Sequence, residues 1–135
     1  GRQEIIYGTE DGWIFAVDPV AGDDLWHLNI VGKVVALEVT EAGVLAASEY
    51  GDVYLLSAMG EILSMQHVSE WIRTATRCGD ELVIATEEGQ LLWLDANGDV
   101  LGAVHVDGEI HHLQARDQDV ICVTQDDTIS AFLSL

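Results

Sequence analysis

The sequence predicts an all-β protein built from repeated four-stranded units. The first reason is a polar turn that recurs at steps of 39, 38 and 38 residues. The second is that each turn lies between two short runs rich in β-branched and aliphatic residues, while a helical 3.6-residue period is not found. The four turns read "TEDG" at 9–12, "SEYG" at 48–51, "TEEG" at 86–89 and "TQDD" at 124–127.

Each recurring turn is expected to join two strands of a β-hairpin. Apolar runs flanking a glycine-containing turn are typical of this motif. The strands before the turns are expected at 5–9, 44–48, 82–86 and 120–124. The strands after the turns are expected at 13–18, 52–57, 90–95 and 128–133.

A second turn extends each hairpin to a further strand. These turns lie at 18–24, 57–61 and 95–99, and they lead into expected strands at 25–30, 62–68 and 100–106. A more polar strand then opens the next unit, at 34–39, 72–77 and 110–116. Each complete unit is therefore expected to be four antiparallel strands in about 38 residues, a period typical of repeat architectures.

The two middle strands of each unit are apolar on both faces, which is expected for a small sheet covered by a neighbour on each side. Four-stranded units that cover one another in this way are β-propeller blades. We expect residues 1–135 to form a single repeat domain of about 3.5 repeats, with units at approximately 4–30, 34–68, 72–106 and 110–135.

The strand count does not close a ring. The first unit lacks its first strand and the last lacks its fourth, which gives three, four, four and three strands, fourteen in all. The chain is thus expected to be half of a larger ring or a strained four-bladed propeller. Because open sheet edges promote association, self-association that completes a ring is a further expectation.

The segment "AVDPVAGDDLW" at 16–26 resembles the tryptophan motif of the PQQ-like, quinoprotein-type propeller repeat. Ala16, Asp18, Gly22 and Trp26 match that motif. The third unit keeps "LDANGDVLG" at 94–102 but has Gly102 in place of the tryptophan, and the second unit has Ser64 there. The resemblance implies the fold more than an activity, because many members of this class bind no quinone and serve as scaffolds.

The charge is strongly negative, with 24 acidic residues against five basic ones and a formal net charge of −19. Such a surface repels nucleic acid and anionic membranes, so neither is expected as a partner. The single lysine, Lys33, favours a protein from a halophile, in which carboxylates keep the surface soluble in salt. A face that binds cations or a basic partner and a merely acidic protein are the alternatives. No signal peptide opens the chain, so a cytoplasmic location is favoured.

Two sets of residues are candidates for binding. The recurring turns should project their acids from one end of the blades, and we call this set the acidic rim: Glu10, Asp11, Glu49, Glu87, Glu88, Asp126 and Asp127. Trp13 and Trp71 align with polar residues of the other units, so we expect them to be exposed and suited to a binding hot spot. A docking protein, which the charge suggests is basic, is the expected partner of such a surface.

Catalytic residues, cofactors and metals are not expected. His67 and His105 share a repeat position with Asn29, but strand-end polar residues are the simpler interpretation. His111 and His112 are adjacent in a strand and should point to opposite faces. Asp18, Asp23 and Asp24 crowd one turn, as turn formation alone requires. Of Cys78 and Cys122, the latter lies in an apolar run that favours a buried thiol, although a disulfide stays possible.

These features together predict a non-catalytic β-propeller interaction scaffold of PQQ-like repeats. A fragment of a quinone- or metal-dependent dehydrogenase and a propeller that binds or senses a small ligand are the alternatives.

Overall fold

The structure is a computed structural model and describes residues 4–106, 110–116, 119–124 and 129–133. These residues form fourteen strands and no helix. The strands are β1 (Ile5–Gly8), β2 (Trp13–Val17), β3 (Asp24–Asn29), β4 (Val34–Thr40), β5 (Gly43–Ser48), β6 (Asp52–Leu56), β7 (Ile62–His67), β8 (Ile72–Cys78), β9 (Glu81–Thr86), β10 (Gln90–Leu94), β11 (Val100–His105), β12 (Ile110–Arg116), β13 (Asp119–Thr124) and β14 (Ile129–Leu133).

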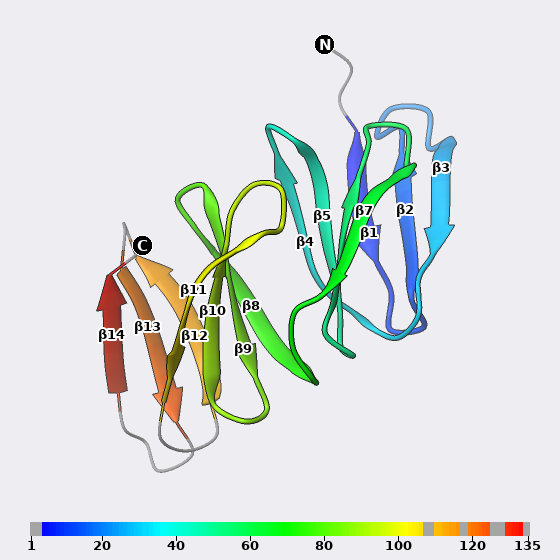
Figure 1. Cartoon of the computed structure of the whole chain (residues 1–135). Coiled ribbons are helices and arrows are strands. Elements are labelled where there is room, and N and C mark those ends of the chain that lie inside the picture. The colour runs from blue at the N-terminus through cyan, green and yellow to red at the C-terminus, as the bar shows by residue number, and fades with distance from the viewer. Residues whose placement is uncertain (1–3, 107–109, 117–118, 125–128, 134–135) are drawn as a thin grey trace.

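The strands form four antiparallel sheets in chain order, each an up-and-down meander (Figure 1). The first sheet is β1-β2-β3, the second β4-β5-β6-β7, the third β8-β9-β10-β11 and the last β12-β13-β14. The predicted all-β fold class and the sequence of three, four, four and three strands are therefore confirmed. We call the sheets blades 1 to 4.

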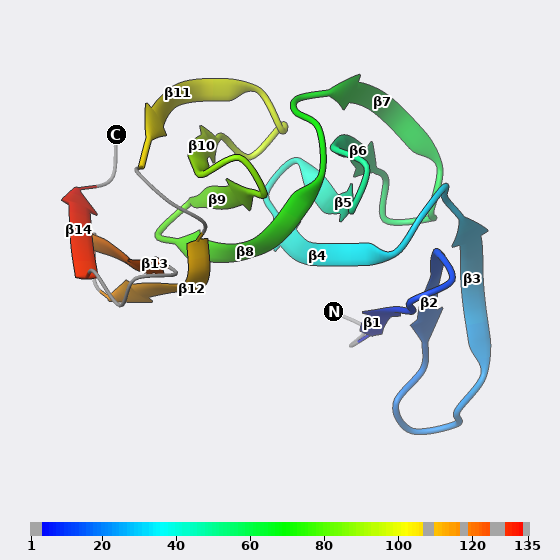
Figure 2. The ribbon, with the colours of Figure 1, turned by 90° about the horizontal axis from the view of Figure 1, so that it is seen from below.

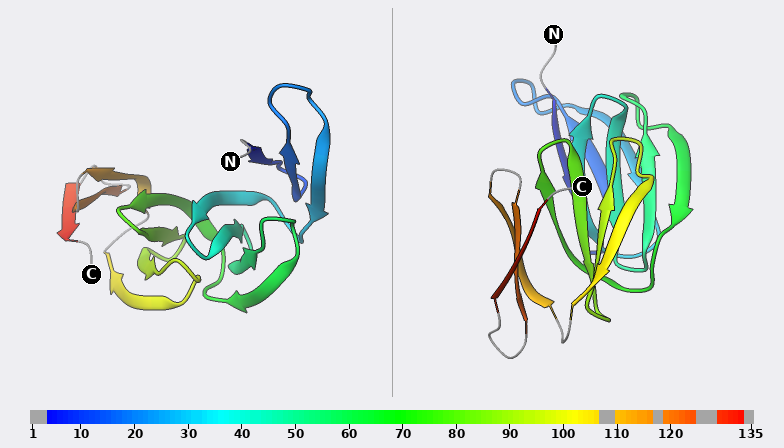
Figure 3. Two further views of the ribbon diagram at one scale, coloured as in Figure 1. Left: turned by 90° about the horizontal axis from the view of Figure 1, so that it is seen from above. Right: turned by 60° about the vertical axis from the view of Figure 1, so that its left-hand side comes forward.

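The blades follow one another in an open arc (Figures 2 and 3). Contacts between blades join β1 to β4, β4 to β8 and β8 to β12, so the first strands of blades 2, 3 and 4 line one side of the arc. Blade 1 and blade 4 stand at opposite ends of it. The described residues thus adopt an open partial propeller rather than the closed four-bladed ring.

Hydrophobic cores fill the spaces between successive blades. Between blades 1 and 2, Ile14 and Ile30 pack against Val44, Tyr54 and Leu56. Comparable cores join blade 2 to blade 3 and blade 3 to blade 4. Strands β5, β6, β9 and β10 are buried on both faces, as the unbroken apolar runs predict, because each lies between two neighbouring blades. Strand β7 at the outer edge is exposed along most of its length.

The motif segment at 16–26 joins blade 1 to blade 2. Ala16 is fully buried, and the Asp18 carboxylate accepts a hydrogen bond from the backbone N–H of Val20 at 2.9 Å. Trp26 Nε1 donates to the carbonyl of Ala58 at 2.9 Å, and its ring lies over Gly60 in the β6–β7 turn. A Cβ atom on Gly60 would come within 2.5 Å of that ring, so the glycine makes room for the tryptophan.

Between blades 2 and 3 a different side chain makes the corresponding link. Gln66 of β7 donates to the carbonyl of Gly98 in the β10–β11 turn, and its amide lies 3.3 Å from the Asp99 carboxylate. The blade therefore keeps a link to its neighbour's turn although Ser64 occupies the tryptophan position.

Candidate binding surface

The turns β1–β2, β5–β6 and β9–β10 lie at the same end of their blades, at the bottom of Figure 1. Each is closed by a hydrogen bond from the glycine N–H to the carbonyl of the first residue of the turn motif, as from Gly51 to Ser48 at 3.1 Å. Each is also held by the following segment, as where Val68 N–H donates to the Gly51 carbonyl at 2.9 Å. The backbone that carries these turns is thus fixed on both sides.

Backbone hydrogen bonds also tie each turn to the linker between blades. The N–H of Glu49 donates to the Lys33 carbonyl at 2.9 Å, and the N–H of Glu87 donates to the Trp71 carbonyl at 3.0 Å. Ile72 N–H donates in turn to the Glu49 carbonyl at 2.7 Å. The linkers and the turns therefore form one continuous surface across blades 1 to 3.

Four carboxylates of the acidic rim are exposed on this surface, namely Glu10, Asp11, Glu87 and Glu88. Glu49 is half-buried, and its carboxylate lies 3.4 Å from the backbone nitrogen of Lys33. Asp11 accepts a hydrogen bond from the Thr9 hydroxyl. Asp126 and Asp127 lie outside the described residues. The part of the rim that the structure describes is consequently a row of acids spread over three blades.

An aromatic pair interrupts this row. Trp71, which is 49% exposed, meets Tyr50 with the ring centroids 5.0 Å apart and the planes at 67°. Tyr50 is itself exposed and lies against Gly32, where a Cβ atom would approach the ring to 2.6 Å. Sequence reasoning selected Trp71 but missed Tyr50. The sequence signal that could have found Tyr50 is its place in the repeat. It takes the turn position that the exposed acids Asp11 and Glu88 hold in blades 1 and 3.

Trp13 lies on a different surface. It is half-buried rather than exposed, because its ring packs against Phe15 at 5.9 Å and His27 at 5.7 Å between centroids. This cluster belongs to the face of blade 1 that points away from blade 2. The two tryptophans selected from the sequence therefore do not form one site.

The histidines are surface residues with local partners. His67 Nδ1 lies 2.9 Å from the Asp52 carboxylate and Nε2 lies 3.2 Å from Glu70. These hydrogen bonds, to Asp52 first and Glu70 second, raise the pKa of His67 above its ordinary value. His105 and His112 are exposed, and the side chain of His111 lies outside the described residues.

A pH-dependent contribution to stability follows for His67. Because its pKa is raised in the fold, the stabilisation is complete below the pKa of the unfolded residue and disappears as the pH rises through the folded value. We expect the wild type to exceed His67→Gln in unfolding free energy at about pH 5.5 and the difference to vanish at about pH 9. Denaturant titrations at both pH values measure it, and His105→Gln, whose strand position is opposite Gln90, is the control. An unchanged difference between the two pH values would contradict the assignment.

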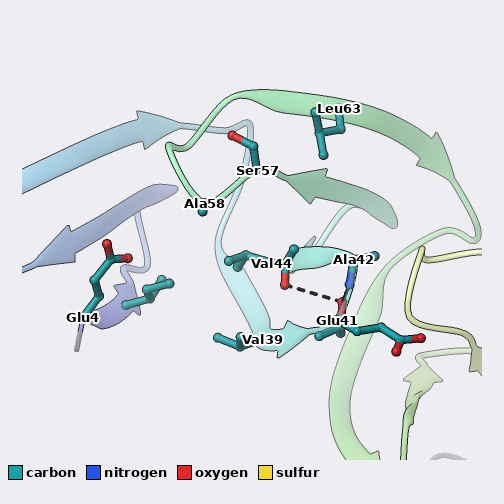
Figure 4. Close-up of a pocket in the computed structure, with 11 residues that line it drawn as sticks. Glu4, Val39, Glu41, Ala42, Val44, Ser57, Ala58 and Leu63 are labelled. Atoms are coloured by element: carbon teal, nitrogen blue, oxygen red, sulfur yellow. Dashed lines mark hydrogen bonds between the residues drawn. The ribbon is translucent and has the colours of Figure 1, made fainter. Parts of the chain in front are cut away.

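A groove between blades 1 and 2 has a volume of about 540 Å³ (Figure 4). Its wall is mainly apolar, with Ile6, Val39, Val44 and Leu63. Glu4 and Glu41 supply carboxylates on opposite sides. The Ser57 hydroxyl in the wall already accepts hydrogen bonds from the N–H groups of Met59 and Glu61, so it takes part in the turn. The lining offers no pairing of a nucleophile with a base among the described side chains.

The turn acids likewise have structural partners. Asp95 accepts from the N–H groups of Asn97 at 2.9 Å and Asp99 at 3.0 Å, and Asp24 pairs with His27 at 2.8 Å. No group of three His, Cys, Asp or Glu side chains suited to a metal ion occurs in the described part of the chain. Cys78 is buried, while the Cys122 side chain is not among those described.

No helix capable of spanning a membrane occurs within the residues that the structure covers.

No protein-family model and no curated protein matches the sequence. Solved structures do match. The computationally designed Ika4 protein superimposes with a TM-score of 0.83 at 21% identity, over 100% of this chain and 88% of that one. BamB from Moraxella catarrhalis gives a TM-score of 0.77 at 17% identity, over 92% of this chain and 38% of that one. BBS1N, solved in complex with ARL6DN, gives a TM-score of 0.78 at 12% identity, over 96% of this chain and 43% of that one.

These likenesses establish the fold. The chain spans most of the designed protein but less than half the length of BamB and BBS1N. Together with the successive antiparallel sheets, they confirm that this chain has the β-propeller repeat fold.

Proposed function

We propose that this chain is a non-catalytic propeller scaffold of PQQ-like repeats that binds a basic protein partner at the end of the blades carrying the acidic rim. The observation that carries the proposal is the exposed Tyr50–Trp71 pair set between the acids of neighbouring turns. Tryptophan and tyrosine are enriched in binding hot spots, and the surrounding carboxylates favour a partner of opposite charge. The net charge of −19 and the single lysine support an origin in a high-salt cytoplasm.

The backbone of Trp71 adds to this argument. Its φ of 45° lies in the left-handed region, which costs a residue other than glycine about 1–2 kcal/mol. Backbone strain of this kind gathers at functional positions. In Trp71 it accompanies a side chain held exposed against Tyr50, which supports a role in binding rather than in the core.

The PQQ-like assignment rests on the motif at 16–26 and on the contact of Trp26 with the neighbouring blade. BBS1N, with a similar fold, is solved in complex with a protein partner, and this is the mode of action we extend to this chain. A dehydrogenase fragment and a small-ligand sensor receive no support from an arrangement of the described side chains.

Binding of a short, labelled lysine- and arginine-rich peptide tests the proposal. We expect Trp71→Ala to weaken binding by at least about tenfold, because a buried aromatic anchor contributes this much or more. The triple variant Glu49→Gln, Glu87→Gln, Glu88→Gln should weaken binding and flatten its salt dependence. Fluorescence anisotropy at low and at molar salt gives the dissociation constants.

A matched triple variant at the opposite end of the blades controls for total charge. This variant also removes three negative charges, all from exposed positions in the β4–β5, β6–β7 and β8–β9 turns. Its substitutions are Glu41→Gln, Glu61→Gln and Asp80→Asn. This variant should bind like the wild type. Equal weakening by both triple variants would mean that the peptide responds only to net charge, and the proposed site would be wrong.

A further inference from the structure

The free face of blade 1 carries a cluster of aromatic and aliphatic side chains, which we call the first-blade aromatic face: Ile5, Tyr7, Trp13, Phe15 and His27. Tyr7 and Phe15 stack with their centroids 5.2 Å apart, and Phe15 lies 6.1 Å from His27. Alternation along the strands places Ile6, Ile14 and Ala16 against blade 2 and their neighbours on this opposite face. Ile5 is 50% exposed and Tyr7 46% exposed, so the edge strand β1 adds apolar surface to this face.

The same repeat positions are buried in the other blades. Val44 and Ala46 of blade 2 correspond to Ile5 and Tyr7, and they are 4% and 0% exposed because blade 1 covers them. Tyr54 corresponds to Phe15 and belongs to that core. In blade 3 the equivalent positions, among them Leu82 and Ile84, pack against blade 2. A preceding blade is therefore the natural cover for the first-blade aromatic face.

The described blades do not supply that cover, because blade 4 stands at the far end of the arc (Figures 2 and 3). Blade 4 does have the backbone of a preceding blade. Strand β13 pairs with β14 so that Ile121 is opposite Ala131 and Val123 is opposite Ile129. Strand β5 pairs with β6 in the same register, with Leu45 opposite Leu55 and Ala47 opposite Val53, and these four residues pack against blade 3.

Charge and length also favour a second copy of this chain as the occupant. The first-blade aromatic face contains no carboxylate, in a chain with 24 acidic residues, and the acid nearest in the sheet, Asp24, is paired with His27. An uncharged face of this kind suits an apolar partner. The chain matches 38% of BamB and 43% of BBS1N, so two copies approach the length of a complete propeller.

We infer that two copies associate head to tail, the first-blade aromatic face of each packing on the β13–β14 face of the other. A head-to-tail interface forms a closed assembly only where the rotation between subunits completes a ring, and here two identical interfaces would close a ring of eight blades. This inference uses a different surface from the acidic rim and does not depend on the proposed function.

Mass in solution tests the inference, by multi-angle light scattering on the full chain in molar salt. Salt screens the repulsion between the acidic subunits and strengthens apolar association. The expected mass of the wild type is twice the 14.7 kDa of one chain. Tyr7→Asp, and separately Ile5→Asp, should give the monomer mass and raise the dissociation constant by at least about 100-fold, because each buries an unpaired charge in the interface.

Met65→Asp is the matched control, because Met65 is 54% exposed on the outer strand β7 and lies away from the proposed contact. It should remain a dimer, and circular dichroism should show the β-sheet spectrum in all variants. A monomeric wild type at every salt concentration, a trimer, or an open polymer would overturn the inference. A Tyr7→Asp or Ile5→Asp variant that keeps the β-sheet spectrum and is still a dimer would also overturn the inference.

Discussion

Replacement of Gly51 by alanine is expected to lower the free energy of unfolding by at least about 3 kcal/mol, in the range reserved for severe local defects. Gly51 has a φ of 94°, a conformation that side-chain-bearing residues avoid. A Cβ atom there would lie 1.6 Å from the carbonyl oxygen of Ser69 and 2.6 Å from its carbon. The obstacle is backbone, so no rotamer change can relieve it.

The position of the clash makes the effect large. Ser69 belongs to the linker that carries Trp71 and leads into blade 3. Moving it would break the hydrogen bond from Val68 N–H to the Gly51 carbonyl and disturb the attachment of blade 3 to blade 2. We therefore expect the third blade to be destabilised along with the turn itself.

Gly22→Ala separates the two causes. Gly22 also has a positive φ, 74°, but a Cβ atom there would meet nothing within 4 Å. This variant should lose only about 1–2 kcal/mol, the cost of the backbone conformation alone. Urea unfolding followed by circular dichroism measures both losses. Equal losses in the two variants would show that the close approach to Ser69 contributes nothing.

The turns could be predicted because the sequence encodes them locally. Glycine at 12, 51 and 89 recurs between apolar runs, and these glycines have φ values of 89°, 94° and 85° in the structure. The apolar runs also predicted that the middle strands are covered on both faces, and Trp93 in one of these strands, β10, is 1% exposed. Turns and buried strands of this kind can be predicted without knowing which blades are in contact.

Features that depend on contacts between blades escaped prediction. Gln66 links blade 2 to the next blade in place of a tryptophan, and it lies two residues after Ser64, which holds the tryptophan position. No sequence motif marks a glutamine that makes such a hydrogen bond. Tyr50 became visible only once its ring met Trp71 across the linker. The partial burial of Trp13 was missed for a different reason. This residue aligns with polar residues of the other units, but Phe15 and His27 of the same blade cover part of its ring. Alignment of the repeats compares equivalent positions and does not show which side chains are in contact in the fold.

Replacement of Trp26 by alanine is expected to loosen blade 1 selectively. The ring packs beside the core between blades 1 and 2 and covers Gly60, and its Nε1 is bonded to Ala58. Truncation of a half-buried tryptophan removes this packing and leaves the Ala58 carbonyl without its donor. We expect a loss of about 3 kcal/mol, the lower end for tryptophan-to-alanine changes in a core.

The loss should be confined because each blade contacts only its neighbours, so the stability of a repeat protein is close to a sum of local terms. Amide hydrogen exchange should therefore accelerate in β1, β2 and β3 while β9 and β10 keep their protection. Trp26→Phe is the control, since it keeps most of the apolar ring and loses only the hydrogen bond, worth about 1 kcal/mol. Uniform acceleration in all blades, or an equal cost for phenylalanine and alanine, would mean that Trp26 does not act as the packing link between blades 1 and 2. Faster exchange limited to blade 1 would instead show that this tryptophan joins the first blade to the arc. Blade 1 carries the surface on which a second copy is expected to dock, so the same tryptophan would also hold that surface in place.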